Sequence, residues 1–116
     1  MRDTRTNSLL AQITVAEEKL AIEDRSDITM YFNGGTIEGK IISDEEYYDR
    51  PENNRYKDVY YNCIKIPREP FIKYFEETGS VDGFPDNLRQ VHLHILNSSN
   101  KSIQIRLADV VAFSFD

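Results

Sequence analysis

Cysteine is almost absent from this chain of 116 residues, which contains only Cys63. A single cysteine excludes an intramolecular disulfide framework and a metal site built from several cysteines. This usage is typical of proteins in a reducing compartment, so we expect a cytoplasmic protein. We interpret Cys63 itself as a small buried apolar side chain.

Long apolar runs are also missing. Residues 1–25 carry charges throughout and hold no apolar run of signal-peptide length. No stretch approaches the roughly 20 apolar residues that cross a bilayer, so we expect no membrane span. Internal repeats and low-complexity tracts are absent as well, and the length predicts one domain over residues 1–116.

Basic residues are fewer than acidic ones. Lysine and arginine number 14 against 20 aspartates and glutamates, which gives a net charge of −6. Proteins that bind nucleic acid usually carry a basic footprint for the phosphates. The acidic balance therefore favours a protein partner over a nucleic acid, especially at residues 44–58, where six acids face three bases in the sequence.

The first thirty residues predict a frayed terminus over residues 1–5, then a helix capped by Thr6 or Asn7. Apolar residues at near-helical spacing indicate its inner face. We expect this face to consist of Leu9, Leu10, Ile13, Ala16 and Leu20.

Residues 27–43, "DITMYFNGGTIEGKIIS", change to a period of two. Ile28, Met30 and Phe32 share one face of the first predicted strand. Asn33-Gly34-Gly35 tolerates the positive φ of a tight hairpin turn. Gly39 within the return strand predicts a bend or a bulge of the kind that curls a sheet into a small barrel.

The middle of the chain predicts mixed structure. Residues 44–58 and 79–89 indicate two loops, the first with one helical turn at residues 44–49. We expect residues 59–66, "VYYNCIKI", to form a strand that ends at Pro67. The following "EPFIKYFEETG" predicts a short helix with proline in its first turn and glycine after its end. Its packing residues are expected to be Phe71, Ile72 and Phe75.

The C-terminal part predicts three more strands. "VHLHIL" and "SIQIRL" alternate around the turn "NSSN", and "DVVAFSF" follows almost at once. In the second strand, Ile103, Ile105 and Leu107 are expected to point inside. The fold class is therefore mainly β (α+β): a small Sm-like or SH3-like antiparallel barrel, with an N-terminal helix and a short helix in the long middle connection.

Two resemblances follow from these stretches. "ITMYFNGGTIEGKIIS" resembles the first Sm motif in its apolar alternation, turn glycine and strand glycine. Residues 27–49 and 90–115 together resemble the gas-vesicle accessory protein U family, in which a hairpin leads to an acidic "EY" turn, a His-Leu strand and a closing apolar strand. That resemblance implies a small non-enzymatic cytoplasmic protein involved in gas-vesicle assembly or clustering.

A tyrosine-rich segment is the predicted partner-binding site. Aromatic and arginine side chains together can stack on bases, and they are equally the composition of a protein–protein hot spot. The surrounding acids favour the protein partner, although half of these rings could instead cap the core. The predicted residues are Tyr47, Tyr48, Tyr56, Tyr60, Tyr61, Arg50 and Arg55.

His92 and His94 lie two apart on one predicted strand, on the same face. Two imidazoles so placed bind zinc only if a third ligand joins them, here Cys63 or an acid. The alternative is a pair of polar residues on the solvent face. Because no catalytic constellation is evident, we expect no enzyme activity and no cofactor.

The preferred function is a non-catalytic adaptor that acts through protein contacts. One alternative is an Sm-like RNA-binding ring, but the aspartate-x-x-x-asparagine element is incomplete, since Tyr48 follows Asp44 at that spacing, and Arg106 precedes Leu107 rather than glycine. A second alternative is a small metal-binding enzyme that uses His92 and His94. Open strand edges also predict a homo-oligomer.

Overall fold

The computed structural model describes residues 8–80, 83–85, 88 and 90–115. The expected frayed terminus at residues 1–5 and the expected cap at Thr6 or Asn7 lie outside these residues. The chain divides into two compact units: the sheet unit, Met1–Tyr47 with Val91–Asp116, and the helical unit, Tyr48–Gln90. A compact unit is not by itself an independently folding domain, so the single domain stays a prediction.

Helix α1 (Ser8–Glu18) confirms the predicted N-terminal helix. Its predicted inner face is right at Leu10 and Ile13, which belong to the core or pack against it, and wrong at the exposed Leu9, Ala16 and Leu20. Leu10, Thr14 and Glu17 are buried, whereas Leu9 and Leu20 are exposed. Two polar residues can replace apolar ones on the buried face because both have partners. The Thr14 hydroxyl donates to the Leu10 carbonyl at 2.9 Å, and the Glu17 carboxylate accepts from the Ser26 amide at 3.2 Å.

Strands β1 (Asp27–Phe32) and β2 (Gly35–Ile42) form the predicted hairpin. The two strands pair antiparallel from Asp27↔Lys40 to Phe32↔Gly35. A two-residue turn, Asn33-Gly34, therefore connects them. The expected positive φ occurs at Gly35, with a φ of 153°, and not at the two turn residues. Ile28 and Met30 are fully buried on one face of β1, as the alternation requires.

Gly39 permits a close approach between β2 and its other neighbour. A Cβ atom there would lie 2.5 Å from the Leu96 carbonyl oxygen and 2.6 Å from the Ile95 Cγ2 atom. The register of β1 with β2 runs through Gly39 without a bulge. Glycine is thus needed at this position because the backbone of the next strand occupies the space of any side chain.

Three more strands complete the sheet: β3 (His92–Leu96), β4 (Ser102–Arg106) and β5 (Ala112–Phe115). A short 3₁₀ turn, Leu107–Asp109, connects β4 to β5. All pairs are antiparallel, and the strand order is β4-β3-β2-β1-β5. The five strands and the N-terminal helix confirm the α+β class, while in the described chain the sheet stays open between β4 and β5.

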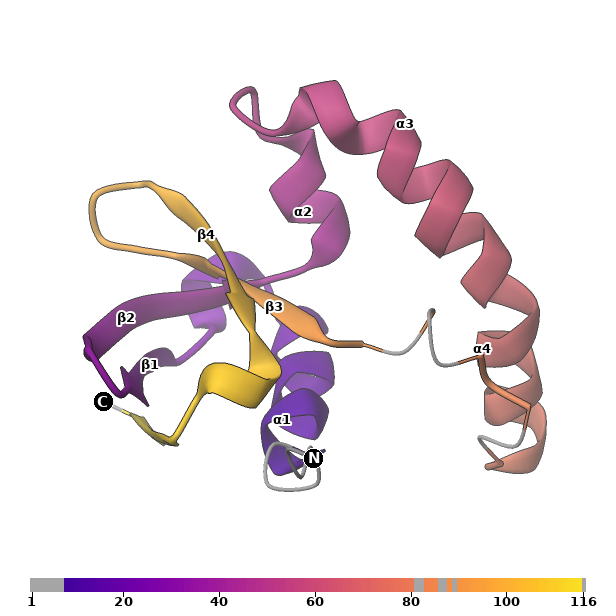
Figure 1. Ribbon diagram of the computed structural model, residues 1–116, viewed down its shortest axis with the longest axis horizontal. Coiled ribbons are helices and arrows are strands. Elements are labelled where there is room, and N and C mark those ends of the chain that lie inside the picture. The colour runs from indigo at the N-terminus through magenta and orange to yellow at the C-terminus, as the bar shows by residue number, and fades with distance from the viewer. Residues whose placement is uncertain (1–7, 81–82, 86–87, 89, 116) are drawn as a thin grey trace. The chain divides into compact units, whose positions relative to one another are not determined.

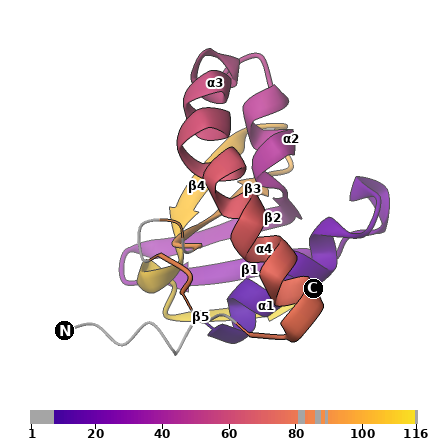
Figure 2. The ribbon, with the colours of Figure 1, turned by 90° about the vertical axis from the view of Figure 1, so that its right-hand side faces the viewer.

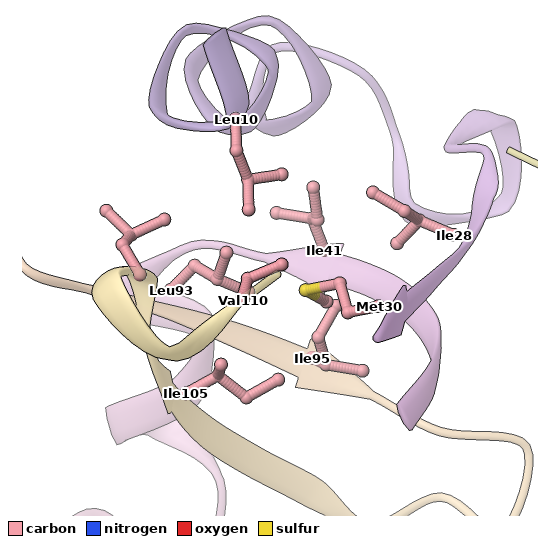
Figure 3. Packing of buried hydrophobic residues seen from close by; sticks show 9 residues of the cluster. Leu10, Ile28, Met30, Ile41, Leu93, Ile95, Ile105 and Val110 are labelled. Atoms are coloured by element: carbon pink, nitrogen blue, oxygen red, sulfur yellow. The ribbon is translucent and has the colours of Figure 1, made fainter. Parts of the chain in front are cut away.

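The core of the sheet unit lies between α1 and one face of the sheet, where Leu10 points from the helix toward the strand residues (Figure 3). Ile105 and Leu107 are buried and Ile103 packs against the cluster, as predicted. The buried cluster consists of Leu10, Ile28, Met30, Ile41, Leu93, Ile95, Ile105, Leu107 and Val110.

The helical unit contains one long helical run. After a 3₁₀ turn (Asn54–Tyr56), α3 (Lys57–Tyr60), a π-helical turn (Tyr61–Lys65) and α4 (Ile66–Thr78) follow without a break (Figure 1 and Figure 2). The predicted helix and its end at Gly79 are confirmed, since Gly79 has a φ of 73° and its amide donates to the Phe75 carbonyl at 2.7 Å. The predicted start is wrong, because α4 begins at Ile66 and Pro70 lies inside it instead of in its first turn. Such a left-handed glycine is a common helix end.

The predicted strand over residues 59–66 is wrong, and Pro67 does not end the element. Proline is tolerated here because it lies in the first turn of α4, directly after the wider π-helical turn. A strand would need neighbours for its backbone groups, whereas a helix satisfies them internally. The apolar alternation of "VYYNCIKI" therefore indicated the wrong period.

The two predicted loops differ in outcome. The helical turn at residues 44–49 is confirmed as α2 (Asp44–Asp49), but much of the rest of the predicted 44–58 loop is helical too. In the 79–89 loop, Gly79, Ser80, Gly83–Pro85 and Leu88 are described, and the Arg68 guanidinium donates to the Leu88 carbonyl. Within the described residues, no helix is long and apolar enough to cross a membrane.

Candidate functional site

The predicted tyrosines belong to two different units and make different ring contacts. Tyr47 belongs to the sheet unit, where its ring stacks on His94 with centroids 3.9 Å apart. In the helical unit, Tyr48 stacks on Tyr60 at 4.8 Å, and Tyr60 meets Tyr61 edge to face at 5.5 Å. Tyr60 is buried, so this three-ring cluster is partly structural.

Tyr61 lies between two lysines of the same helical run. The Lys65 ammonium is 4.4 Å from the ring centroid and 3.4 Å from the hydroxyl, and the Lys57 ammonium is 5.8 Å from the centroid. Lys57 also forms an ion pair with Asp49 at 2.5 Å, and this carboxylate raises the pKa of Lys57. These cation–ring contacts and the ion pair thus hold the Tyr61 ring of the three-ring cluster in place.

The two predicted arginines differ in their contacts. Arg50 is paired with Glu52 at 3.2 Å, whereas the Arg55 guanidinium lies 5.1 Å from the centroid of the Tyr56 ring. Tyr56 is 54% exposed. The Arg50 guanidinium would have to give up its Glu52 carboxylate in order to bind a phosphate, so it gains less binding free energy than an unpaired cation would. Arg50 is therefore a poor phosphate ligand.

Exposed apolar side chains along the helical run were missed by the sequence reasoning. Ile72 and Phe75, expected to pack the helix, are 44% and 49% exposed. Only Phe71 of the predicted trio is half-buried, with its ring 5.6 Å from that of Phe84. The helical run therefore presents large apolar groups to solvent. They are Val59, Ile66, Ile72, Tyr74 and Phe75.

Cys63 is also exposed. It lies in the π-helical turn, and its side chain is exposed, so the expected burial is wrong. The burial expectation failed because it rested on the strand now replaced by a helix. Cys63 is in the helical unit while both histidines are in the sheet unit.

His94 is buried and not on a solvent face. It is 3% exposed, and its Nε2 atom lies 2.8 Å from the Asp44 carboxylate. His92 is half-buried, and burial lowers its pKa, with further lowering by the nearby His94 and Arg106. In the part of the chain that the structure describes, no group of three histidine, cysteine, aspartate or glutamate side chains is placed to hold a metal ion.

A buried arginine organises the surroundings of α2. Arg25 donates to the Glu46 carboxylate at 2.7 Å and to the Leu20 and Ile41 carbonyls at 2.9 Å each. These partners come from the segment after α1, from β2 and from α2. Arg25 thus ties three segments of the sheet unit together through charge-assisted hydrogen bonds.

Glu46 also closes a capping box at the start of α2. Its amide donates to the Ser43 hydroxyl at 3.1 Å, and its carboxylate accepts from the Ser43 amide at 2.7 Å. Burial works to raise the pKa of Glu46, but the hydrogen bonds from Arg25 and Ser43 outweigh it and lower that pKa. The serine-x-x-glutamate spacing was a readable signal for this cap.

Glu18 carries the strongest electrostatic strain in the neighbourhood. Burial, together with the nearby acids Asp44 and Glu45, raises its pKa to about 7 against the opposing effect of Arg25. An acid with such a value changes charge near neutral pH. Glu18 lies at the end of α1, beside α2. The stability of the protein with Glu18 protonated and with Glu18 ionised can therefore be compared to test the packing of these two helices.

Comparison with known proteins leaves the family open. No protein-family model matches the chain, and neither the curated proteins nor the solved structures give a match. The functional argument therefore rests on the residues themselves.

Proposed function

We propose that the protein is a non-catalytic adaptor that acts through protein–protein contacts, and that the exposed Ile72 and Phe75 of α4 are part of its docking surface. The observation that carries this proposal is the exposure of these two large apolar side chains, which are three residues apart and therefore lie on the same face of α4. Large apolar groups gathered on a surface are typical of interaction sites, because burying them in a complex removes them from water.

The composition of the helical run supports a protein partner. Aromatic residues are enriched at the centres of protein interfaces. The helical run exposes two aromatic side chains, Tyr74 and Phe75, and the exposed Tyr56 comes just before it. The Tyr48–Tyr60 stack and the lysine contacts of Tyr61 hold the neighbouring rings in place. A surface that is ordered before binding loses less conformational entropy when it binds.

We further propose that the sheet unit is a small barrel of the Sm-like or SH3-like kind. The strand order β4-β3-β2-β1-β5 and the 3₁₀ turn before β5 support this assignment. The segments that resemble gas-vesicle accessory protein U, residues 27–49 and 90–115, contain all five strands. A gas-vesicle-related partner in the cytoplasm is therefore the most specific form of the proposal.

The test changes two exposed apolar residues of α4. The variant carries Ile72→Ser and Phe75→Ser, and the matched control carries Glu76→Ser and Glu77→Ser in the same part of the helix. Both pairs replace exposed side chains by serine, so both variants should stay folded. Partners captured by crosslinking in cells of the source organism are purified, and their affinities are measured by calorimetry.

The proposal predicts that the Ile72 and Phe75 double variant loses about tenfold or more in affinity for the captured partner. The control should bind within about twofold of the unchanged protein, since rim charges contribute little. Equal affinities for all three proteins, or saturable turnover of a substrate by the unchanged protein, would contradict it.

An Sm-like RNA-binding ring is the second candidate, and one observation favours it. The exposed Tyr56 ring, with the Arg55 guanidinium 5.1 Å from its centroid, is an aromatic and arginine pair of the kind that can stack on a base. RNA binding of this kind should weaken steeply with added salt and should be lost with Arg55→Glu. A salt-independent partner interaction would favour the adaptor.

A further inference from the structure

The turn of the β1–β2 hairpin contains an asparagine in a reactive setting. Asn33 is the only asparagine of the chain that glycine follows. Both turn residues are exposed to solvent. In the part of the chain that the structure describes, neither the Asn33 side chain nor the Gly34 amide makes a hydrogen bond. The side-chain amide of Asn33 and the next backbone nitrogen are therefore free to approach each other.

Gly34 leaves its own backbone nitrogen accessible. Glycine has no Cβ atom that could shield the nitrogen, and its backbone moves more freely than that of any other residue. The hairpin ladder ends at the Phe32↔Gly35 pair, so the Gly34 nitrogen lies outside it. This nitrogen can thus move toward the Asn33 side chain without breaking a hydrogen bond of the sheet.

The second hairpin turn of the same sheet is different. The Oδ1 atom of Asn97 accepts hydrogen bonds from the Ser99 amide at 3.0 Å and from the Lys101 amide at 2.9 Å. These bonds hold the Asn97 side chain in place, and serine, not glycine, follows it. Asn97 is therefore an internal reference for an asparagine that is protected in a turn.

We propose that Asn33 is a self-modification site, at which the Gly34 nitrogen displaces the side-chain amide and water completes the conversion to aspartate or isoaspartate. The Gly34 nitrogen gives its proton to a base in solution and bonds to the Asn33 Cγ atom. The bond from Cγ to Nδ2 breaks, and the side-chain nitrogen takes up a proton and leaves as ammonia. The product is a five-membered succinimide ring, and no atom is oxidised or reduced.

Hydrolysis of the ring gives two products. Water that cleaves the new bond between Cγ and the Gly34 nitrogen gives aspartate with an ordinary main chain. Water that cleaves the bond between the Asn33 carbonyl carbon and the Gly34 nitrogen gives isoaspartate, in which the main chain runs through Cβ and Cγ. In both cases one water is consumed, one ammonia is released and one carboxylate is formed.

The two products affect the hairpin differently. Aspartate is common in such turns and should leave the hairpin intact. Isoaspartate adds the Cβ atom to the main chain, and because the turn sets the register of a hairpin, the longer turn strains the Phe32↔Gly35 pair. Phe32 packs against the core cluster, so the strain reaches the core. The modification therefore loosens the hairpin in aged molecules, whatever the partner of the helical unit.

The experiment follows the purified full chain by peptide-mapping mass spectrometry during incubation at pH 8 and at pH 5. We expect conversion at Asn33, and faster conversion at pH 8 because the attacking nitrogen must lose its proton. Asn97 should stay intact over the same period. An Asn33 that stays intact, or an Asn97 that is converted as fast as Asn33, overturns the proposal.

Two variants separate the glycine from the hydrogen bonds. A Cβ atom at Gly34 meets nothing within 4 Å, so Gly34→Ala should fold normally and slow the conversion of Asn33 about tenfold or more. Ser98→Gly places a glycine after Asn97, whose side chain stays tied by two hydrogen bonds, so Asn97 should remain intact. An undiminished rate in Gly34→Ala excludes attack by the Gly34 nitrogen. Conversion of Asn97 in Ser98→Gly at the rate of Asn33 excludes the role of the free side chain.

A further comparison tests the effect on the hairpin. The isoaspartyl form is separated by ion exchange, and Asn33→Asp supplies the ordinary product with the same charge. Hydrogen exchange of β1 and β2 should be faster in the isoaspartyl form than in Asn33→Asp, and equal rates overturn the proposed loosening. If circular dichroism shows that Gly34→Ala is unfolded, Asn33→Gln takes its place, because its longer side chain must close a larger ring.

Discussion

Arg25 and Glu46 form an ion pair of 2.7 Å in which the arginine side chain is only 4% exposed. A charge removed from water this far needs partners for its donors. Arg25 has them in the Glu46 carboxylate and in the Leu20 and Ile41 carbonyls. The position of α2 on the sheet unit therefore depends on one arginine between α1 and β1.

Replacement of this arginine should be costly. We expect Arg25→Met to lower the free energy of unfolding by about 3 kcal/mol, because Glu46 and two carbonyls lose their donor. Arg50→Met should cost less than about 1 kcal/mol, since the Arg50–Glu52 pair is at the surface. Urea unfolding measures both. Equal losses would show that Arg25 is not the organising residue.

Glu18 predicts a dependence of stability on pH. Its pKa is about 7 in the folded chain against an ordinary 4.5, so between these values the folded chain holds a proton that the unfolded chain has released. Stability is therefore lost as the pH rises from about 4.5 through 7. Glu18→Gln should stabilise the protein by about 1 kcal/mol at pH 8, a value reduced for solvent screening, and by nothing at pH 4.

Thermal or urea unfolding of Glu18→Gln across this pH range checks the prediction. The exposed Glu23→Gln is the control for a general change in net charge. A gain from Glu18→Gln that is the same at pH 4 and pH 8 would show that the carboxylate is not strained in the folded chain.

A side chain at Gly39 should clash with β3, and Gly34 provides the matched control. Gly39→Ala places a Cβ atom within 2.6 Å of β3 atoms, whereas a Cβ atom at Gly34 meets nothing within 4 Å. We expect Gly39→Ala to destabilise the protein by about 1–3 kcal/mol, because the backbone of β3 must shift. Gly34→Ala should cost less than half of that. Chemical denaturation of both variants decides the comparison.

Tyr47 and Tyr56 should respond differently to truncation. Tyr47→Ala removes the ring stacked on buried His94, so we expect a loss of about 1–3 kcal/mol of stability. Tyr56→Ala removes an exposed ring and should change stability by less than about 0.5 kcal/mol. If Tyr47→Ala and Tyr56→Ala lose the same amount of stability, then Tyr47 behaves as an exposed ring, as the predicted surface patch requires.

Local patterns in the sequence were sufficient to predict much of the secondary structure of the sheet unit. The hairpin followed from the alternation around Asn33-Gly34, and the closing strands followed from Ile103, Ile105 and Leu107. These signals depend on neighbours close in sequence, and the turn fixes the register. The same reasoning could have found the α2 cap from Ser43 and Glu46.

The remaining features depend on contacts between distant residues. "VYYNCIKI" has strand-like composition, yet it continues the helical run from α3 into α4. Arg25 is one of several arginines in the sequence, and only the folded chain brings Glu46 to it. The tyrosines of residues 47–61 are neighbours in sequence, but Tyr47 stacks on His94 of β3. Tertiary packing overrides local propensity at each of these places.

We propose that this protein works through protein contacts and not through nucleic acid. The deciding measurement is purification without nuclease treatment, followed by size exclusion with light scattering and ultraviolet spectra. We expect a particle of at most a few copies with the spectrum of a pure tyrosine-containing protein. A larger ring-sized particle with excess absorbance at 260 nm would overturn this proposal and favour an Sm-like RNA-binding ring.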